Sequence, residues 1–350
     1  MSRVLFILKR REDYNTEKHN HIGLSTGLYN SAKFMHDMLL QNGIECHLEV
    51  VADYNAIDRQ IFLYKPTHVI LEAIWVTPAK LTTLQQLHPR VKWIVRVHSE
   101  MPFMAGEGQA LDWIGDYSGC KNVVIAMNAP RMLREISNYL RIRNRWTTAH
   151  TVERSIYLPN YYPQQYVSRK FDREKTHVDV ACFGAIRPLK NHLVQAFAAI
   201  EFAESIGKHL KFHVNAGRIE MQGQPAISNL KCLFEQLHDS GHEMINHEWR
   251  PREEFLLLCA QMDIGLQVSF SETFNIVGAD LISQGVPLIG TANEIPWAVN
   301  AFCADPTNSE NIAAKMRTSY KFPMLNVKSH QYNLSKYTEK SQEIWTNYFG

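Results

Sequence analysis

The chain has 350 residues, of which 45% are hydrophobic, and its 37 Lys and Arg residues nearly balance 35 Asp and Glu residues. This length favours two domains, each able to bury its own core. The formal net charge of +2 excludes a charge excess that would by itself indicate a nucleic-acid or anionic-membrane partner. The six cysteines lie apart without a CxxC pair, so reduced structural thiols are favoured over a disulfide framework.

The N-terminal segment holds an apolar run of five residues, VLFIL, before charged residues resume. That run is too short for a signal peptide or a membrane span. We therefore expect a cytoplasmic protein without a transmembrane segment.

Over residues 1 to about 145, short apolar runs typical of strands alternate with amphipathic stretches typical of helices. The expected strands are RVLFIL, THVILEA, KWIVRVH and NVVIAM. The expected helices are GLYNSAKFMHDMLLQNG, PAKLTTLQQLH and APRMLREISNYLRIR. This alternation predicts a mostly parallel sheet covered by helices on both faces.

The loop between the first expected strand and the first expected helix, KRREDYNTEKHNHIGLSTG, is about twice the usual length for such a connection. It ends with Gly23, Ser25, Thr26 and Gly27, where backbone N–H groups could approach a phosphate or sugar at the helix N-terminus. The pattern is not GxGxxG, so a dinucleotide site is not supported. A helix cap formed by Ser25 or Thr26 is an equally weighted alternative.

His98 follows the expected strand KWIVRV, at the end of a sheet where doubly wound folds bind ligands. A histidine there can orient a sugar or share a proton with it. A histidine held only by local hydrogen bonds is an equally weighted interpretation.

A cluster of arginines follows in the segment RMLREISNYLRIRNR. It could form a basic face that meets phosphates, although most such runs are solvated helix faces. The arginines are Arg131, Arg134, Arg141, Arg143 and Arg145.

The segment YLPNYYPQQYVSRKFDREKT lacks a core period and is the expected linker. Strand-like runs resume after it with HVDVACFGA, LKFHVNA, DIGLQVS and VPLIG. A final amphipathic segment has no strand after it. We therefore expect a first Rossmann-like domain over 1–160, a linker over 161–177, a second Rossmann-like domain over 178–328, and a helix over 329–350 that crosses back toward the first domain.

The loop FGAIRPLKNH, after the first strand of the second domain, contains Gly184, Arg187 and Lys190. Two cations three positions apart at a strand-to-helix junction could hold a diphosphate together with helix-end amides. Solvated surface charges are the alternative.

The segment SFSETFNIVGADLISQGVPLIGT predicts a helix that begins near Phe274 and stops at Gly285, followed by a buried strand. Glu272 then lies just before the helix and Asp280 within it. Carboxylates in these places could bind the hydroxyl groups of a ligand at the helix N-terminus.

The 16 histidines make metal binding a competing hypothesis. The segment HDSGHEMINHE is not HExxH, because His242 and His247 are five positions apart and Ser240 and Gly241 interrupt the helix that would align His238 with His242. No DxD element lies at a strand end. We expect neither a metal nor another cofactor.

The block GAIRPLKNH, followed by MDIGLQVSFSETFNIVGADLISQGVPLIGT, resembles the donor half of a retaining GT-B glycosyltransferase, in particular family 4. There a glycine-ending strand precedes an Arg and a Lys, and a Glu-x7-Glu element precedes a Gly-Val-Pro strand. This chain has Glu272-x7-Asp280, so its second carboxylate is shorter by one methylene. The resemblance covers most of residues 178–300, and implies an α/β GT-B fold of two doubly wound Rossmann-like domains facing across a cleft.

The resemblance implies a role for each matched residue. Arg187 and Lys190 would bind the donor diphosphate, Glu272 the hydroxyls of the donor sugar, and Asp280 the ribose hydroxyls. With His98, the first three would form the catalytic set. The remaining donor-binding positions would be Gly23, Ser25, Thr26, Gly27, Gly184, Thr273, Phe274, Asn275 and Ile276, with Trp249 and Arg250 lining the nucleobase.

The activity so implied is transfer of a sugar, with retention, from a nucleoside-diphosphate sugar, expected to be UDP-linked, to an acceptor hydroxyl. The stretches VRVHSEMPFMAGEGQALDW and QVSFSETFNIVGAD are similar to glycosyltransferases of phage as well as bacterial genomes. The acceptor could thus be a hydroxymethylated base of duplex DNA, in the host cytoplasm, or a bacterial glycan. A nucleotide-sugar epimerase of the same fold and a non-catalytic nucleotide-sugar-binding protein are the alternatives. The sequence does not indicate an oligomeric state.

Overall fold

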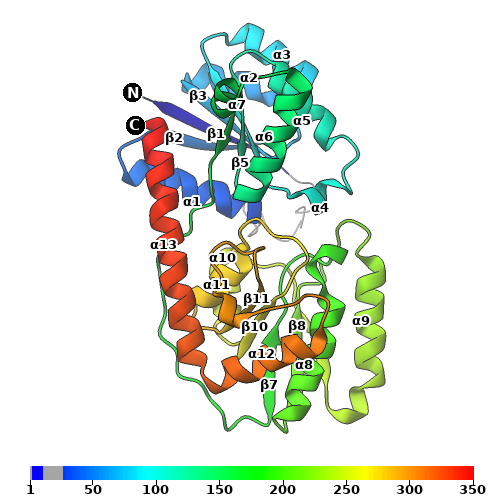
Figure 1. The fold of residues 1–350 in the computed structure, drawn as a ribbon. Coiled ribbons are helices and arrows are strands. Elements are labelled where there is room, and N and C mark those ends of the chain that lie inside the picture. The colour runs from blue at the N-terminus through cyan, green and yellow to red at the C-terminus, as the bar shows by residue number, and fades with distance from the viewer. Residues whose placement is uncertain (1, 11–26) are drawn as a thin grey trace. The chain divides into compact units, whose positions relative to one another are not determined.

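The computed structural model describes residues 2–10 and 27–350. They divide into two compact units. Within the described residues, the first unit consists of 2–10, 27–161 and Thr338–Gly350, and the second of Tyr162–Tyr337. Each unit contains one parallel sheet with helices packed around it (Figure 1).

The first unit is a six-stranded sheet in the order β2-β1-β3-β4-β5-β6, in which neighbouring strands run parallel. The strands are β1 Arg3–Lys9, β2 Glu45–Val51, β3 His68–Glu72, β4 Lys92–Val97, β5 Val123–Met127 and β6 Ser155–Tyr157. The helices are α1 Gly27–Gln41, α2 Ala56–Tyr64, α3 Pro78–Leu87, α4 Met101–Met104, α5 Ala110–Gly119, α6 Pro130–Asn144 and α7 Thr148–Arg154.

The second unit is also a six-stranded parallel sheet, in the order β12-β11-β10-β7-β8-β9. The strands are β7 His177–Ala181, β8 His209–Val214, β9 Glu243–Asn246, β10 Ile264–Gln267, β11 Leu288–Thr291 and β12 Cys303–Ala304. The helices are α8 His192–Ser205, α9 Gln224–Gln236, α10 Arg252–Cys259, α11 Ile276–Ser283, α12 Ser309–Lys321 and α13 Pro323–Phe349, with short 3-10 turns at Pro188–Lys190, His238–Ser240 and Asn300–Phe302.

The strand order of the second unit reverses between β7 and β10, since the chain builds β7-β8-β9 in one direction and β10-β11-β12 in the other. Such a switch point leaves a crevice beyond the carboxyl ends of the two central strands, where doubly wound folds bind ligands. The predicted α/β class with two doubly wound sheets is confirmed.

Two strands of the first unit, β2 and β6, were not predicted. β2 lies at the sheet edge and carries charged residues on its exposed positions, so it has no continuous apolar run. β6 is at the other edge and has only three residues. Helix α13 begins at Pro323 rather than at 329, as is typical of proline in the first turn of a helix. Its residues from Thr338 belong to the first unit.

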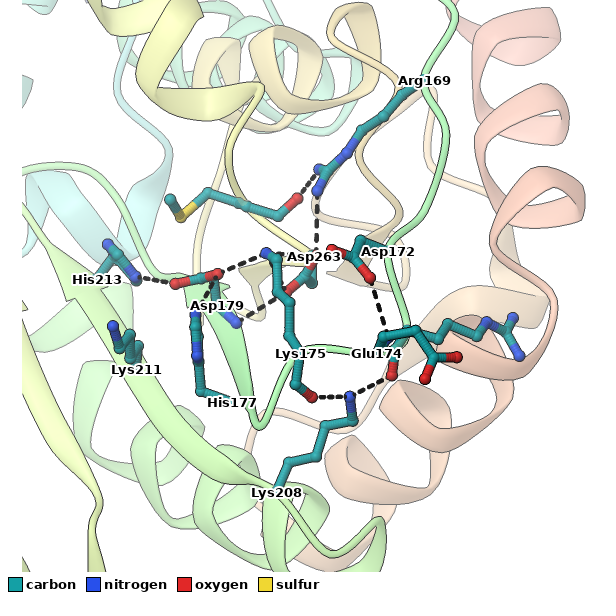
Figure 2. Close-up of polar contacts among 12 residues, drawn as sticks. Arg169, Asp172, Glu174, Lys175, His177, Asp179, Lys208, Lys211, His213 and Asp263 are labelled. Carbon is teal, nitrogen blue, oxygen red and sulfur yellow. Dashed lines mark hydrogen bonds and ion pairs between the residues drawn. The ribbon is translucent and has the colours of Figure 1, made fainter.

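The segment between the two units' sheets, predicted as a linker over 161–177, is fixed to the second unit (Figure 2). Arg169 donates to the Asp263 carboxylate at 3.1 Å, and the Lys175 ammonium lies 2.8 Å from Asp179 and 3.2 Å from Asp263. Asp179 belongs to β7. This strand begins at His177, which was predicted to be the last residue of the linker. These ion pairs make the segment part of the second unit's surface.

The first unit contains a buried arginine, Arg96, in the middle of the sheet's carboxyl edge. Its guanidinium and the carboxylate of Glu72, its partner in the register of β3 and β4, are both 0% exposed and lie 3.2 Å apart. The same guanidinium donates to Asn160 at 2.5 Å and to the Leu158 carbonyl at 3.2 Å. It lies 5.2 Å from the centroid of the Trp345 ring. Arg96 thereby ties the ends of β3 and β4 to residues 158–160 and to α13.

Replacing this buried cation tests how much the first unit depends on it. Arg96→Ala should lower the free energy of unfolding by about 3 to 5 kcal/mol, because Glu72 would remain buried without its main counter-charge. Thermal unfolding followed by circular dichroism measures the loss. The matched control is Arg134→Ala on the exposed face of α6, which should change stability by no more than about 0.5 kcal/mol. Equal melting temperatures for the two variants would contradict this account.

Candidate functional site

The candidate site lies at the carboxyl edge of the second unit's sheet, at the switch point between β7 and β10. The loop after β7 contains Gly184 and Arg187 and ends in the 3-10 turn Pro188–Lys190. The loop after β10 contains Glu272 and leads into α11. Because β7 and β10 are paired and parallel, the two loops emerge side by side.

Side-chain amides hold these two loops together. Gln267, the last residue of β10, donates to the Phe183 carbonyl at 2.9 Å. Asn191 donates to the Val268 carbonyl at 3.1 Å, and Gln195 accepts from the Val268 N–H at 2.8 Å. Buried side-chain amides that are hydrogen-bonded hold the two loops in one relative position. The sequence analysis did not identify these amides, because polar residues inside a helix or strand give no pattern of their own.

Lys190 and Glu272 form an ion pair between the two loops, with Nζ against Oε1. Their side chains are only 12% and 7% exposed. Burial lowers the pKa of Lys190; Glu272 opposes that effect and Arg187 adds to it. Burial disfavours ionised Glu272, but Lys190 and Arg187 outweigh burial and hold the pKa of Glu272 below its ordinary value. The structure thus brings Arg187, Lys190 and Glu272 together, and keeps the carboxylate charged.

Arg187 is also linked to the loop after β8. Its guanidinium lies 3.6 Å from the Glu220 carboxylate, which also pairs with Arg218. The Arg218 guanidinium lies 5.4 Å from the centroid of the Trp249 ring. These contacts connect Trp249, a predicted nucleobase residue, to the predicted diphosphate arginine. The neighbouring Arg250 is half-buried.

Gly184 is required by the backbone of the first loop. Its φ is +121°, a conformation that side chains rarely adopt. Its N–H donates to the Asn215 side chain at 3.3 Å. The backbone therefore favours glycine here, and the predicted donor-binding role of Gly184 stays a prediction.

The four predicted residues at the start of α11 divide into two kinds. Asn275 caps the helix with φ at +65°, accepting from the Gly278 N–H at 2.7 Å, while Phe274 is buried against Trp297. Thr273 and Ile276 keep part of their surface accessible. The helix begins at Ile276 and Gly285 has φ at +73° just beyond its end, close to the predicted bounds. Asn275 and Phe274 therefore shape the helix start, whereas Thr273 and Ile276 can be reached by a ligand.

Asp280 is buried and already bound by protein groups. The Tyr162 hydroxyl donates to its Oδ1 at 2.7 Å and the Arg252 guanidinium lies 2.8 Å from the same atom. Burial raises the pKa of Asp280, although Arg252 and Tyr162 oppose the shift. A ribose hydroxyl would have to share this carboxylate with Tyr162 and Arg252. The predicted ribose contact stays a prediction.

Glu294 is a further carboxylate at this edge, and the sequence analysis did not single it out. It follows β11, and its Oε2 accepts from the Glu272 N–H at 3.1 Å. A carboxylate just after the strand VPLIGT was the available signal, because strand-end loops of parallel sheets share one edge. Glu294 helps to hold the backbone from which Glu272 projects.

His98 lies in the first unit, directly after β4. Its Nε2 is 2.5 Å from the Glu72 carboxylate and its Nδ1 is 3.3 Å from the Asn128 amide. Its side chain is 16% exposed. Burial and the nearby Arg96 lower the pKa of His98, and Glu72 opposes them. The histidine is held by local hydrogen bonds, as in one interpretation. It also keeps some accessible surface, which the other interpretation, contact with a sugar, requires.

Glu72 was not identified from the sequence. The sequence does show an acidic residue at the end of the apolar run THVILEA. That run forms the strand next to the one that His98 follows. Gly23, Ser25 and Thr26 lie outside the described residues. Gly27 is the exposed first residue of α1.

The histidines that suggested a metal have other partners. His242 Nε2 lies 2.7 Å from the Glu204 carboxylate, and His213 and His247 contact each other at 2.8 Å. Within residues 2–10 and 27–350, no three His, Cys, Asp or Glu side chains are grouped to hold a metal ion. His19 and His21 lie outside this range. None of the helices that the structure describes is long and apolar enough to cross a membrane.

Two doubly wound sheets in one chain, with a charged switch point in the second, match the GT-B class of glycosyltransferase folds. A UDP-forming α,α-trehalose-phosphate synthase from Burkholderia vietnamiensis matches at TM-score 0.69 and 9% identity, over 100% of this chain and 96% of that chain. The sucrose-phosphate synthase of Thermosynechococcus elongatus matches at TM-score 0.66 and 10% identity, over 99% of this chain and 98% of that one. The chain therefore has the GT-B fold.

A third solved structure is the pneumococcal O-GlcNAc transferase GtfA in complex with UDP and GlcNAc. It matches at TM-score 0.56 and 15% identity, over 84% of this chain and 59% of that chain. No protein-family model matches the sequence, and no curated protein matches it.

If His98 acts on a substrate, its loss should affect turnover more than stability. His98→Ala should lower kcat by about tenfold or more, because removing a contact that strengthens in the transition state raises the barrier by more than about 1.4 kcal/mol. The ion pair between Glu72 and Arg96 would remain in this variant, so its melting temperature should fall much less than that of Arg96→Ala. The readout is nucleoside diphosphate released from a nucleoside-diphosphate sugar per folded molecule.

The control for this variant is His242→Ala, which removes a buried histidine of the second unit whose two ring nitrogens are bound by the Leu210 N–H and the Glu204 carboxylate. It should lower the melting temperature and leave turnover per folded molecule unchanged. If His98→Ala behaved like His242→Ala, His98 would be a structural residue.

Proposed function

We propose that this protein is a retaining glycosyltransferase that takes its sugar from a nucleoside-diphosphate sugar. The observation that carries the proposal is the buried Lys190–Glu272 pair with Arg187 beside it, at the switch point of a GT-B donor-type sheet. Two cations and one carboxylate in such a crevice match the charges of a diphosphate and the hydroxyls of a sugar. The resemblance of this segment to family 4 supports the same assignment.

In the proposed reaction, Arg187 and Lys190 bind the diphosphate and stabilise the negative charge that grows on it as the glycosidic bond breaks. Electrostatic groups contribute most where charge develops in the transition state. An ammonium has three donors, so Lys190 can keep its bond to Glu272 while it donates to a phosphate oxygen. Because the two side chains supply positive charge, the proposed reaction requires no metal ion.

Glu272 is proposed to bind hydroxyls of the donor sugar, since it is held ionised and therefore only accepts hydrogen bonds. Retaining hydrolases use a second carboxylate as nucleophile. We assign no nucleophile to this chain. The leaving phosphate is proposed to deprotonate the acceptor hydroxyl from the same face, which retains the configuration at the anomeric carbon.

UDP is the proposed donor nucleotide. Two of the three solved structures named above are described with UDP, one as UDP-forming and one in complex with UDP. Trp249, linked to Arg187 through Arg218 and Glu220, is proposed to stack against the base. Calorimetry with UDP, ADP and GDP would rank the three nucleotides.

Two other functions make different predictions. A nucleotide-sugar epimerase would interconvert the donor sugar without an acceptor, and would need acid and base groups beside the sugar's C2. A nucleotide-sugar sensor would bind the donor without turnover. Release of nucleoside diphosphate that depends on an acceptor supports the transferase, whereas slow hydrolysis of the donor alone argues against the sensor.

Variants of the four site residues should differ in whether UDP binding, sugar transfer or both are impaired. Asp280→Ala should mainly weaken binding of free UDP, because ribose contacts are similar in the ground and transition states. Glu272→Ala should leave UDP binding nearly intact and impair transfer. Arg187→Ala and Lys190→Ala should impair both, each by about 1.5 to 3 kcal/mol for a lost charge-assisted hydrogen bond. Calorimetry with UDP, followed by transfer kinetics, separates these outcomes.

Asp280 requires its own control, because it also binds Tyr162 and Arg252. Tyr162→Phe removes one donor to the carboxylate and leaves the carboxylate in place. It should lower stability and keep UDP affinity. If Asp280→Ala bound UDP as tightly as the parent, the carboxylate would serve only to hold Tyr162 and Arg252.

We propose a hydroxymethylated base of duplex DNA as the acceptor, with a bacterial glycan as the second candidate. The proposal rests on the similarity to phage glycosyltransferases and on the arginines of α6. Arg131 pairs with Glu100 at 2.9 Å and Arg143 with Asp116 at 2.8 Å. The three remaining arginines, Arg134, Arg141 and Arg145, are exposed. Arg134 and Arg141 are seven positions apart and lie on one side of α6, and Arg145 directly follows the end of the helix.

If DNA is the acceptor, binding to duplex should weaken steeply as salt rises, because phosphate contacts release counterions. The double variant Arg141→Glu and Arg145→Glu should reduce transfer to DNA without changing UDP affinity. The matched control, Arg59→Glu with Arg90→Glu, makes the same charge change at exposed positions outside α6 and should leave transfer nearly unchanged. Salt-insensitive activity on a small glycan would overturn the DNA proposal in favour of the glycan.

A further inference from the structure

We infer that Glu72 is a positioning residue for His98: it holds the imidazole in the tautomer with the proton on Nε2 and leaves Nδ1 as the hydrogen-bond acceptor that faces a substrate hydroxyl. The inference rests on the proposed function for the identity of that substrate, and on the geometry of the first unit for everything else. It assigns a chemical role to a buried carboxylate that touches no substrate.

Glu72 lies between a permanent cation and the imidazole. Arg96 approaches both carboxylate oxygens, at 3.3 and 3.2 Å, while His98 Nε2 lies 2.5 Å from Oε2. Glu72 and Arg96 are register partners on β3 and β4, and His98 is two residues beyond Arg96. Side chains two positions apart on a strand project to the same face. The sheet register therefore places the carboxylate against both side chains.

The protonation of this group follows from its partners. A guanidinium stays charged in proteins, so the fully buried Glu72 beside it is ionised and can only accept hydrogen bonds. An unprotonated Nε2 at 2.5 Å from a carboxylate oxygen would set two lone pairs against each other, so Nε2 carries a proton.

The other ring nitrogen is then unprotonated in the neutral imidazole. A proton on Nδ1 as well would give two cations against a single buried carboxylate, which burial disfavours. Nδ1 is therefore the acceptor of the ring, and in this structure the Asn128 amide lies 3.3 Å from it. Burial and Arg96 also lower the pKa of His98, in agreement with a neutral ring.

The carboxylate is itself held in place. Arg96 is fixed by the Asn160 side chain, the Leu158 carbonyl and the Trp345 ring. Asn160 is also bound by the Ser31 hydroxyl at 2.9 Å. Contacts of this kind fix the carboxylate, and through it the orientation of the imidazole.

The consequence concerns how a substrate is recognised. In a neutral His98, Nδ1 is a hydrogen-bond acceptor that Asn128 contacts in this structure; there it can accept a hydrogen bond from a sugar or acceptor hydroxyl, and it cannot donate one. As the hydroxyl gains acidity in the transition state, its hydrogen bond to Nδ1 strengthens, while the leaving phosphate takes the proton. Glu72 keeps the ring in the orientation and tautomer that present Nδ1 to the hydroxyl.

The first experiment is independent of activity. In protein labelled with 15N-histidine, the spectrum of the two ring nitrogens of His98, assigned by its disappearance in His98→Ala, should show a protonated Nε2 and an unprotonated Nδ1 at neutral pH. A dominant Nδ1-protonated ring in the parent protein would overturn the inference, whatever the variants do.

The second experiment uses Glu72→Gln. Its glutamine keeps the size of the side chain and removes the charge, so kcat should fall by about tenfold or more while UDP affinity stays unchanged. In the His98→Ala background the same substitution should change kcat less than about twofold, because Glu72 acts through the imidazole. An equal loss in both backgrounds would show that Glu72 is structural and would overturn the inference.

The matched control is Asp263→Asn, which removes another buried, ion-paired carboxylate. It should lower the melting temperature and leave turnover per folded molecule unchanged. Should Glu72→Gln fail to fold, the spectrum of the parent protein decides the question. If the parent neither transfers nor hydrolyses any nucleotide sugar, the proposed function fails, while the ring spectrum still tests the role of Glu72.

Discussion

A charged pair, Lys190 and Glu272, is kept in a place from which water is largely excluded, and the second unit is arranged around that constraint. Removing either charge from water is unfavourable, and the attraction between the two offsets this only when the geometry is well defined. The geometry comes from the backbone: Gly184 allows the chain to turn after β7, and Gln267, Asn191 and Gln195 join the two loops by hydrogen bonds.

A similar arrangement is built into the first unit. There the carboxylate of Glu72 is buried between Arg96 and His98, at the carboxyl end of neighbouring parallel strands. In both units, an ionised carboxylate is held by a cation. Such preorganised charges need little rearrangement when a ligand binds, which is why they are effective in catalysis. The two sites differ in their second partner, since the first unit adds the His98 imidazole and the second adds the Arg187 guanidinium beside the Lys190 ammonium.

Much of the fold and part of the site could be predicted from the sequence. Buried parallel strands appear as apolar runs, so the eight central strands of the two sheets were predicted, whereas the edge strand β2 alternates polar and apolar residues. Arg187, Lys190 and Glu272 were identified because each lies in a strand-end loop. Glu72 and Gln195 were missed because their importance depends on the register of β3 with β4 and on the hydrogen bond from the Val268 N–H, just after β10, to Gln195 of α8, which no local pattern records. Asp280 was found at the predicted place, but its contacts with Tyr162 and Arg252 come from distant segments.

The central claim is that the Lys190–Glu272 pair marks a nucleotide-sugar donor site. A crystal structure of the protein with bound UDP tests it most directly. The account predicts diphosphate oxygens within hydrogen-bonding distance, about 3 Å, of both Lys190 Nζ and the Arg187 guanidinium. UDP bound elsewhere, with no phosphate oxygen near either cation, would contradict it.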